Sequence, residues 1–303
     1  MWFKNIRLVV LTEPFQLTPE QLEENLVDNL FQPCSSYDKS SLGWISPLGR
    51  DGEMLTHTVG KYTMICAQEQ ERLLPVSVVR DATDERVAEL EERQARKVYR
   101  KERRQIQDEV YASLLPQAFV RNQLLFAYLA PAENLLIIDT PSAPRAEALL
   151  NLLRDSLGSL PVANPEVRRS PGDVMTRWLQ EQKATHKFTI EHDCELYNPL
   201  DGSNVVRCKG QDLLTDELRA MLAADKRVKS LGVMWNNKVS CIVHDDLSIR
   251  RVRFEGMLEE SGDVADVDSA AQQFDQEFAL MSLELAGFFK DLFAAFGGLR
   301  KNG

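Results

Sequence analysis

A dense cluster of basic residues at 93–104 most constrains the fold of this 303-residue chain. Seven of the twelve residues are Lys or Arg and one is Glu, so the local charge is 7 − 1 = +6, whereas the whole chain carries −10. The rest of the chain therefore sums to −10 − 6 = −16. An acidic protein that gathers its cations in one place is expected to use that place for a polyanion. The basic residues are Arg93, Arg96, Lys97, Arg100, Lys101, Arg103 and Arg104.

The cluster lies inside a helix that the sequence predicts over residues 75–111. This range has no Gly or Pro after its first residue and would form a rod on the order of 50 Å long. Its apolar residues are too few to bury a full face, so the helix is expected to project into solvent, pair with a partner or lie against a charged ligand. Two interpretations stay open: a solvated charged face, or a ladder of cations for phosphates.

Elsewhere the chain alternates short strands and helices, which predicts an α+β fold with mixed sheets. Residues 3–12 and 61–69 read as strands, 123–129 and 134–139 as a hairpin, and 143–157 as a helix that ends at a glycine. A second strand-rich group follows the linker-like residues 163–173. Its predicted elements are strands at 187–191, 204–208, 228–235, 238–244 and 249–254, and one helix near 215–224.

A long C-terminal helix is predicted at about 270–296. Its apolar residues recur every three or four positions, which places them on one face. Two roles stay open for this face: closing the core of the monomer, or forming a dimer contact. Nine acids and no base lie between Phe254 and Phe289. The apolar residues are Phe274, Phe278, Met281, Leu285, Phe288, Leu292 and Phe296, and the acids are Glu255, Glu259, Glu260, Asp263, Asp266, Asp268, Asp275, Glu277 and Glu284.

Two smaller clusters are further candidates for contact with nucleic acid or protein. Phe119 and Arg121 follow a proline break, where an exposed aromatic ring would suit a protein contact or a wedge against bases, and a core position is the alternative. Lys209 and Gln211 lie at a strand end, where they would contact phosphate and sugar or simply be solvated.

The sequence carries no recognisable catalytic motif, and we expect no enzyme activity, no cofactor and no metal. It lacks a phosphate-binding GxxxxGK[ST] loop, a GxGxxG turn and a GxSxG elbow. The acid pair Asp245 and Asp246 leaves a metal-dependent nuclease as an alternative, and a scaffold for an acidic protein partner is another. Five scattered cysteines without a CxxC pair, no signal peptide and no run of eighteen apolar residues predict a cytoplasmic protein without a membrane span.

The order and spacing of eleven short segments resemble the bacterial RdgC family along essentially the whole chain. They are WFKNI (2–6), FQPC (31–34), GW (43–44), LTH (55–57), ICA (65–67), ERQARK (92–97), DEV (108–110), LLPQAF (114–119), LLRDSLGSLPV (152–162), KGQDL (209–213) and FDQEFALMSLEL (274–285). The resemblance implies a ring-shaped homodimer with a basic central hole. Such a protein binds double- and single-stranded DNA with little sequence preference, associates with the nucleoid and restrains RecA-promoted recombination.

The resemblance also assigns roles to residues of this chain. The basic cluster matches the family's Lys/Arg-rich helix, Phe119 matches a gate-region aromatic, and Lys209 with Gln211 matches a basic segment that often holds two adjacent lysines. Here Gly210 follows Lys209, so one cation is missing. Phe119 with Phe278, Leu285 and Phe289 is the predicted dimer interface.

Four regions are predicted from these features. They are a central α+β domain (1–74 with 120–165), a projecting basic helix with the gate segment (75–119), a second α+β domain (166–254) and a C-terminal acidic, Phe-rich helical region for dimerisation (255–303).

Overall fold

The computed structural model describes residues 1–49, 52–256 and 270–300, and its fold is α+β. Twelve strands of the described part form one sheet with the order β2-β4-β5-β6-β1-β12-β11-β10-β8-β9, while β3 pairs with β4 and β7 pairs with β1. All of these pairings are antiparallel, so the predicted α+β class is confirmed. Five of the nine acids between Phe254 and Phe289 lie outside the described residues: Glu259, Glu260, Asp263, Asp266 and Asp268.

Nine of the twelve strands coincide with predicted ones, and several of these are longer, whereas β2, β3 and β7 were not predicted. Their bounds are β1 Asn5–Leu11, β2 Ser40–Ile45, β3 Thr56–Val59, β4 Tyr62–Leu73, β5 Phe119–Ala130, β6 Leu135–Asp139, β7 Val162–Ala163, β8 Phe188–Asn198, β9 Asp201–Cys208, β10 Arg227–Trp235, β11 Val239–His244 and β12 Ile249–Phe254. Asn236 and Asn237 take left-handed backbone angles in the tight turn from β10 to β11, as asparagine tolerates there.

Seven α-helices and three short 3-10 turns lie in the same part of the chain. The α-helices are α1 Pro19–Leu26, α2 Val76–Gln94, α3 Arg100–Leu114, α4 Ala143–Leu157, α5 Pro171–Glu181, α6 Asp216–Ala223 and α8 Ala270–Ala295, and the turns are Val27–Asn29, Leu115–Gln117 and Pro131–Glu133. None of these helices has the length and hydrophobicity needed to span a membrane.

Local sequence signals explain where the helices on the sheet begin and end. Thr18 and Gln21 form a reciprocal capping box at the start of α1. The hydroxyl of Ser142 accepts a hydrogen bond from the Arg145 amide at the start of α4, and Gly158 ends that helix with φ 71°.

The alternation along β1 shows how the two faces of the sheet are used. Ile6 and Leu8 point into the core that α5 and α8 cover, whereas Val9 and Leu11 point into the core that α1 and α4 cover. Arg7 shares the second face, because it lies two residues before Val9. Helices α1 and α4 therefore cover one face of the sheet only in its first half. The same face continues, without these helices, across β12, β11, β10, β8 and β9.

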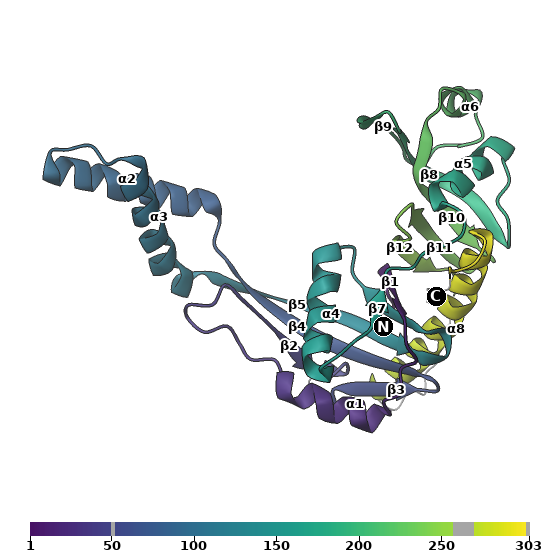
Figure 1. The fold of residues 1–303 in the computed structure, drawn as a ribbon, viewed down its shortest axis with the longest axis horizontal. Coiled ribbons are helices and arrows are strands. Elements are labelled where there is room, and N and C mark those ends of the chain that lie inside the picture. The colour runs from purple at the N-terminus through teal and green to yellow at the C-terminus, as the bar shows by residue number, and fades with distance from the viewer. Residues whose placement is uncertain (50–51, 257–269, 301–303) are drawn as a thin grey trace.

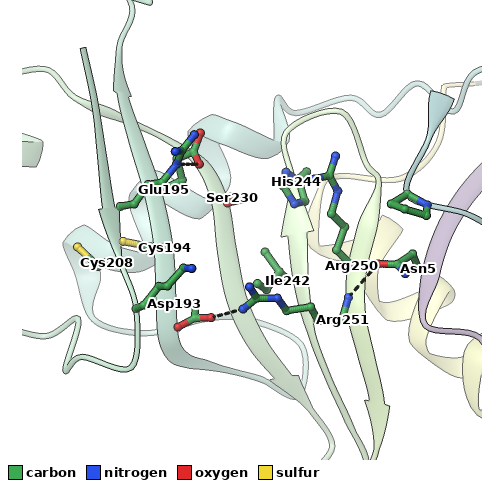
Figure 2. Close-up of a pocket in the computed structure, with 13 residues that line it drawn as sticks. Asn5, Asp193, Cys194, Glu195, Cys208, Ser230, Ile242, His244, Arg250 and Arg251 are labelled. Carbon is green, nitrogen blue, oxygen red and sulfur yellow. Dashed lines mark hydrogen bonds and ion pairs between the residues drawn. The ribbon is translucent and has the colours of Figure 1, made fainter. Parts of the chain in front are cut away.

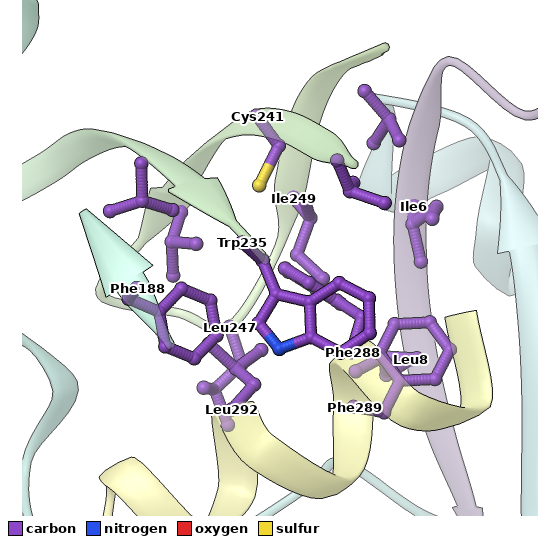
Figure 3. Packing of buried hydrophobic residues seen from close by; sticks show 14 of the residues in the cluster. Ile6, Leu8, Phe188, Trp235, Cys241, Leu247, Ile249, Phe288, Phe289 and Leu292 are labelled. Carbon is purple, nitrogen blue, oxygen red and sulfur yellow. The ribbon is translucent and has the colours of Figure 1, made fainter. Parts of the chain in front are cut away.

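Helix α8 buries its aromatic stripe against the chain's own sheet (Figure 3). The ring of Phe288 lies edge-on to Trp235, with centroids 6.0 Å apart, and Phe278 lies edge-on to Tyr128 at 5.6 Å. Phe278, Leu285 and Phe289 of the predicted dimer interface are all buried within this monomer core. Of the two roles left open for the stripe, the structure therefore shows the closing of the monomer core.

The prediction of one continuous helix over 75–111 is wrong. Helix α2 ends at Gln94, Ala95 adopts a left-handed conformation with φ 49°, and α3 starts at Arg100 and packs against α2. The backbone amide of Val98 donates to the Glu91 carboxylate at 2.7 Å, which fixes the connecting loop. Folding back lets each polar helix bury its few apolar side chains, such as Val87 and Ile106, which a single solvated rod would expose.

The described part of the chain has the shape of a crescent (Figure 1). The α2–α3 unit projects from the ends of β4 and β5 and forms one tip, whereas β9 and α6 form the other tip. Helix α4 lies on the inner side between the tips, and α8 runs along the outer side. The predicted division into four regions stays a prediction.

Gly43 of β2 lies where a larger residue would collide with a neighbouring backbone. A Cβ atom built there would come within 2.6 Å of the Phe31 backbone nitrogen. We expect Gly43→Ala to lower the free energy of unfolding by roughly 1–3 kcal/mol, because backbone atoms cannot yield as a flexible side chain can. Urea unfolding would measure the loss. Gly202→Ala is the matched control, since no atom lies within 4 Å of its Cβ position; equal losses in the two variants would contradict the prediction.

Candidate nucleic-acid interface

The basic cluster surrounds the turn between α2 and α3, at the free end of the projecting tip (Figure 1). Two of its seven cations are already paired with carboxylates: Arg96 binds both oxygens of Glu102, one of them at 2.8 Å, and Arg103 pairs with Asp84. The other five side chains are exposed and have no carboxylate partner among the described residues. They are Arg93, Lys97, Arg100, Lys101 and Arg104, and we call them the tip cations.

The tip as a whole is electrically balanced. Residues 76–117 contain nine Lys or Arg and nine Asp or Glu, so their net charge is 9 − 9 = 0. The acids are spread along α2 and α3, whereas seven of the cations lie in the twelve residues at the turn. The positive potential is therefore confined to the distal end of the tip. A negatively charged ligand is attracted there and not to the rest of the tip.

A second group of cations lies at the other end of the crescent, on the face of the sheet that α4 leaves uncovered. Strands β8, β9, β10 and β12 turn their apolar residues toward α5 and α8, so alternate side chains point to the open face. A hollow of about 480 Å³ is formed there (Figure 2). Its charged lining residues are Asp193, Glu195, Arg207, Lys209, His244, Arg250 and Arg251.

Acids on the open face neutralise some of these cations. Arg251 pairs with Asp193 at 3.0 Å and Arg207 with Glu195 at 2.7 Å. Burial raises the pKa of the Glu195 carboxyl, but the hydrogen bond and charge of Arg207 outweigh it and leave that pKa below its usual value. The Arg207–Glu195 and Arg251–Asp193 pairs therefore fix the positions of these side chains but add little net positive charge to the hollow.

Lys209 and Arg250 remain as cations of the hollow with no carboxylate partner among the described residues. The Nε atom of Arg250 is buried and makes no hydrogen bond within that part of the chain. A buried donor without a partner costs free energy, so an acceptor in the hollow would stabilise it. A phosphate oxygen has the charge and hydrogen-bonding capacity for this position.

His244 lines the same hollow and is held neutral. Burial lowers the pKa of its imidazole below 6.5, and the charge of Arg250 lowers it further. Below pH 6.5 the unfolded chain therefore takes up a proton that the folded chain does not, so stability falls as the pH falls through this range. We expect His244→Asn to flatten the decline in the free energy of unfolding between pH 7 and about pH 5, measured by urea unfolding. If the free energy of unfolding declines with the same slope in the variant and the wild type, His244 is not the group that causes the decline.

The remaining predicted residues lie in separate places. Phe119 begins β5 at the base of the tip, opposite Leu73 of β4, and is 86% exposed. Arg121 is paired with Glu71 at 2.8 Å, so its charge is largely neutralised. Gln211 is exposed, and its backbone amide donates to the His192 carbonyl at 3.1 Å. The tip cations and the Lys209 region thus lie at opposite ends of the crescent (Figure 1).

Sequence reasoning missed the arginines of β12. The stretch IRRVRF at 249–254 was predicted as a strand, and its alternation places Ile249, Val252 and Phe254 in the core. Arg251 departs from the simple alternation through a left-handed backbone with φ 53°. The signal for a second basic surface was present in the three arginines of this strand.

The acid pair Asp245 and Asp246 lies in the turn between β11 and β12. Asp246 accepts hydrogen bonds from the amide and hydroxyl of Ser248, and Arg7 lies 3.7 Å from it. Its carboxylate therefore closes a local turn. No group of three or more His, Cys, Asp or Glu side chains that could hold a metal ion is found in the described part of the chain.

The fold and these surfaces define a class: an α+β protein built on one crescent-shaped antiparallel sheet, with cation clusters at both ends. A sequence model described as "Putative exonuclease, RdgC" matches residues 1–299. The chain belongs to the RdgC family, as the segment pattern predicts.

Curated relatives named recombination-associated protein RdgC match the chain over nearly its full length. The protein of Aeromonas hydrophila is 42% identical over 298 residues, which cover 98% of both chains. That of Tolumonas auensis is 42% identical over 299 residues, which cover 98% of this chain and 99% of the relative. That of Pseudomonas aeruginosa PAO1 is 40% identical over 299 residues, with 98% of both chains covered.

Proposed function

We propose that this protein binds double- and single-stranded DNA without sequence preference and restrains RecA-mediated recombination as a ring-shaped homodimer. It acts without catalysis and without a cofactor, in the cytoplasm at the nucleoid. The observation that carries the proposal is the placement of unpaired cations at the two ends of one crescent, in a chain whose net charge is −10. The curated relatives are named for recombination, which is a process of DNA.

The chemistry of the cations favours contact with the DNA backbone. The tip cations are long, exposed side chains on a short turn, and they can follow phosphates without a fixed geometry. Lys209 and Arg250 add cations on the open sheet face, where the buried Nε of Arg250 needs an acceptor. Groups that contact only phosphates carry no sequence information, so the protein should bind unrelated sequences alike.

A dimer of two crescents would close a ring through two self-complementary contacts. Phe119 is the remaining candidate from the predicted interface, because its ring is exposed while Phe278, Leu285 and Phe289 are buried in the monomer. Acids over the rest of the surface would keep DNA from binding outside the ring. Such a ring would restrain RecA by occupying the DNA on which the recombinase acts.

Binding of the wild-type protein to DNA tests the proposal directly. We expect equal affinity, within about threefold, for two duplexes of unrelated sequence, and a steep linear fall of log K with log salt concentration. Fluorescence anisotropy at four salt concentrations would measure both. A preference of a hundredfold for one sequence, or affinity that does not change with salt, would contradict phosphate-based binding.

The same samples distinguish the proposal from its two alternatives. Labelled DNA incubated with Mg²⁺ or Mn²⁺ should stay intact, and its degradation, abolished by Asp245→Asn with Asp246→Asn, would establish a nuclease. A protein partner that remains bound to the α2–α3 tip after nuclease treatment would favour the scaffold. In a strand-exchange reaction, added protein should lower the yield only while it is bound to the DNA.

A further inference from the structure

Two cysteines face each other across neighbouring strands at the end of the sheet. Cys194 of β8 and Cys208 of β9 are direct partners in the antiparallel register, and both are free thiols. Figure 2 shows their sulfur atoms side by side. Both cysteines lie at the margin of the core, and both line the hollow that also contains Lys209.

The register places the Cα atoms of these two cysteines at a separation that a disulfide can span. Directly opposed residues of an antiparallel pair have Cα atoms about 4.5–5.5 Å apart. Disulfides join residues whose Cα atoms are about 4.4–6.8 Å apart, so the backbone needs no large movement. Strand β9 is the last strand of the sheet order and is paired on one side, which leaves it free to make the small adjustment of the side-chain dihedral angles.

We propose that Cys194 and Cys208 form a reversible disulfide when the folded protein is oxidised by a peroxide. In the first step the Cys208 sulfur attacks one oxygen of hydrogen peroxide, the O–O bond breaks, and Cys208 becomes a sulfenic acid with release of one water. In the second step the Cys194 sulfur attacks the Cys208 sulfur, the S–O bond breaks, and the thiol proton leaves with the hydroxyl as a second water. Both sulfurs are oxidised by one electron each, and the peroxide is reduced.

The surroundings of the two thiols set their order of reaction. Cys208 is half-buried, so a peroxide can reach its sulfur. Cys194 is 5% exposed, and burial, with the neighbouring Cys208 second, raises the pKa of its thiol to about 12. Cys194 therefore stays a thiol until the sulfenic acid forms beside it.

The other three cysteines have no thiol in a facing position. Cys66 is opposite Ile45 and Phe126, and Cys241 is opposite Val233. Burial raises the pKa of the Cys66 thiol to about 12 and that of Cys241 further. Cys34 is half-buried like Cys208, and its sulfur donates to the Gln70 carbonyl at 3.4 Å, so it is the matched control for exposure without a partner.

The test treats the folded protein with a slight excess of hydrogen peroxide, then denatures it and counts free thiols with iodoacetamide by intact-mass spectrometry. The five cysteines of the reduced protein should fall to three labelled ones, and dithiothreitol should restore five. A non-reduced peptide map should join the peptide of Cys194 to that of Cys208. Formation of this link only after unfolding, or no loss of label, would overturn the proposal, and this readout needs no variant.

Variants then test the order of the steps. Cys34→Ser should keep the link, whereas Cys194→Ser should lose it and leave Cys208 as a sulfenic acid that dimedone captures. Cys208→Ser should leave Cys194 unmodified at the same peroxide dose. In the Cys194→Ser variant, faster labelling of Cys34 than of Cys208 by dimedone would overturn the assignment of Cys208 as the thiol that reacts first with peroxide.

Discussion

Replacing Lys97, Arg100 and Lys101 together by Gln should weaken DNA binding roughly 100- to 1,000-fold near 0.1 M salt for each protomer that contacts the DNA. Each phosphate contact releases about 0.9 counterion from duplex DNA, so three lost contacts per protomer lower the affinity by about one order of magnitude each at most. The slope of log K against log salt should fall by about three per protomer, and by about five in the proposed dimer. These three side chains are exposed and unpaired within the described residues, so their loss leaves no carboxylate without its partner.

A control with the same change of charge separates local contact from the overall field. Arg80, Arg86 and Arg219 are also exposed, but each lies beside a carboxylate, at 3.7, 3.1 and 3.2 Å. Their joint replacement by Gln should reduce affinity less than about tenfold. Equal losses in the two triple variants would show that only net charge matters, and unchanged affinity in the first would exclude the tip as the DNA surface.

Phe119→Ala should weaken dimerisation by roughly 30- to 1,000-fold, because a buried aromatic anchor at an interface contributes about 2–4 kcal/mol. In the monomer this ring is 86% exposed, although it lies on a strand that pairs along its whole length with β4. Such exposure of a large aromatic side chain costs free energy unless a partner covers it. Sedimentation velocity over a range of protein concentrations would measure the change.

Tyr37→Ala is the control for this variant, since Tyr37 is 79% exposed on a loop outside the predicted interface. It should leave the oligomeric state unchanged. The ring itself is tested on closed circular DNA, where wild-type protein should survive a high-salt wash and Phe119→Ala should not. A dimer as stable in Phe119→Ala as in the wild type would remove Phe119 from the interface.

Much of the fold and part of the site could be predicted because they depend on short-range patterns. The glycine that ends α4 is a local backbone requirement that was predicted and is confirmed, and the capping box at Thr18 and the Asn236–Asn237 turn are local in the same way. The basic cluster was visible as composition alone. Which of its cations lack a carboxylate partner could not be predicted, because Arg103 pairs with Asp84, nineteen positions away in the sequence.

The amino-acid sequence by itself determined the α+β class, the positions of nine of the twelve described strands, the RdgC family and the presence of a concentrated positive charge. Tertiary structure decided that α2 and α3 fold back on each other, since the turn at Ala95 is stabilised by contacts between Glu91, Val98 and the packed helices. It also decided that α8 covers the sheet of its own chain and that Arg250 joins Lys209 in one hollow. The physical reason is that the spacing of apolar residues shows which face of a helix or strand is buried. The surface against which that face packs is formed by residues distant in the sequence.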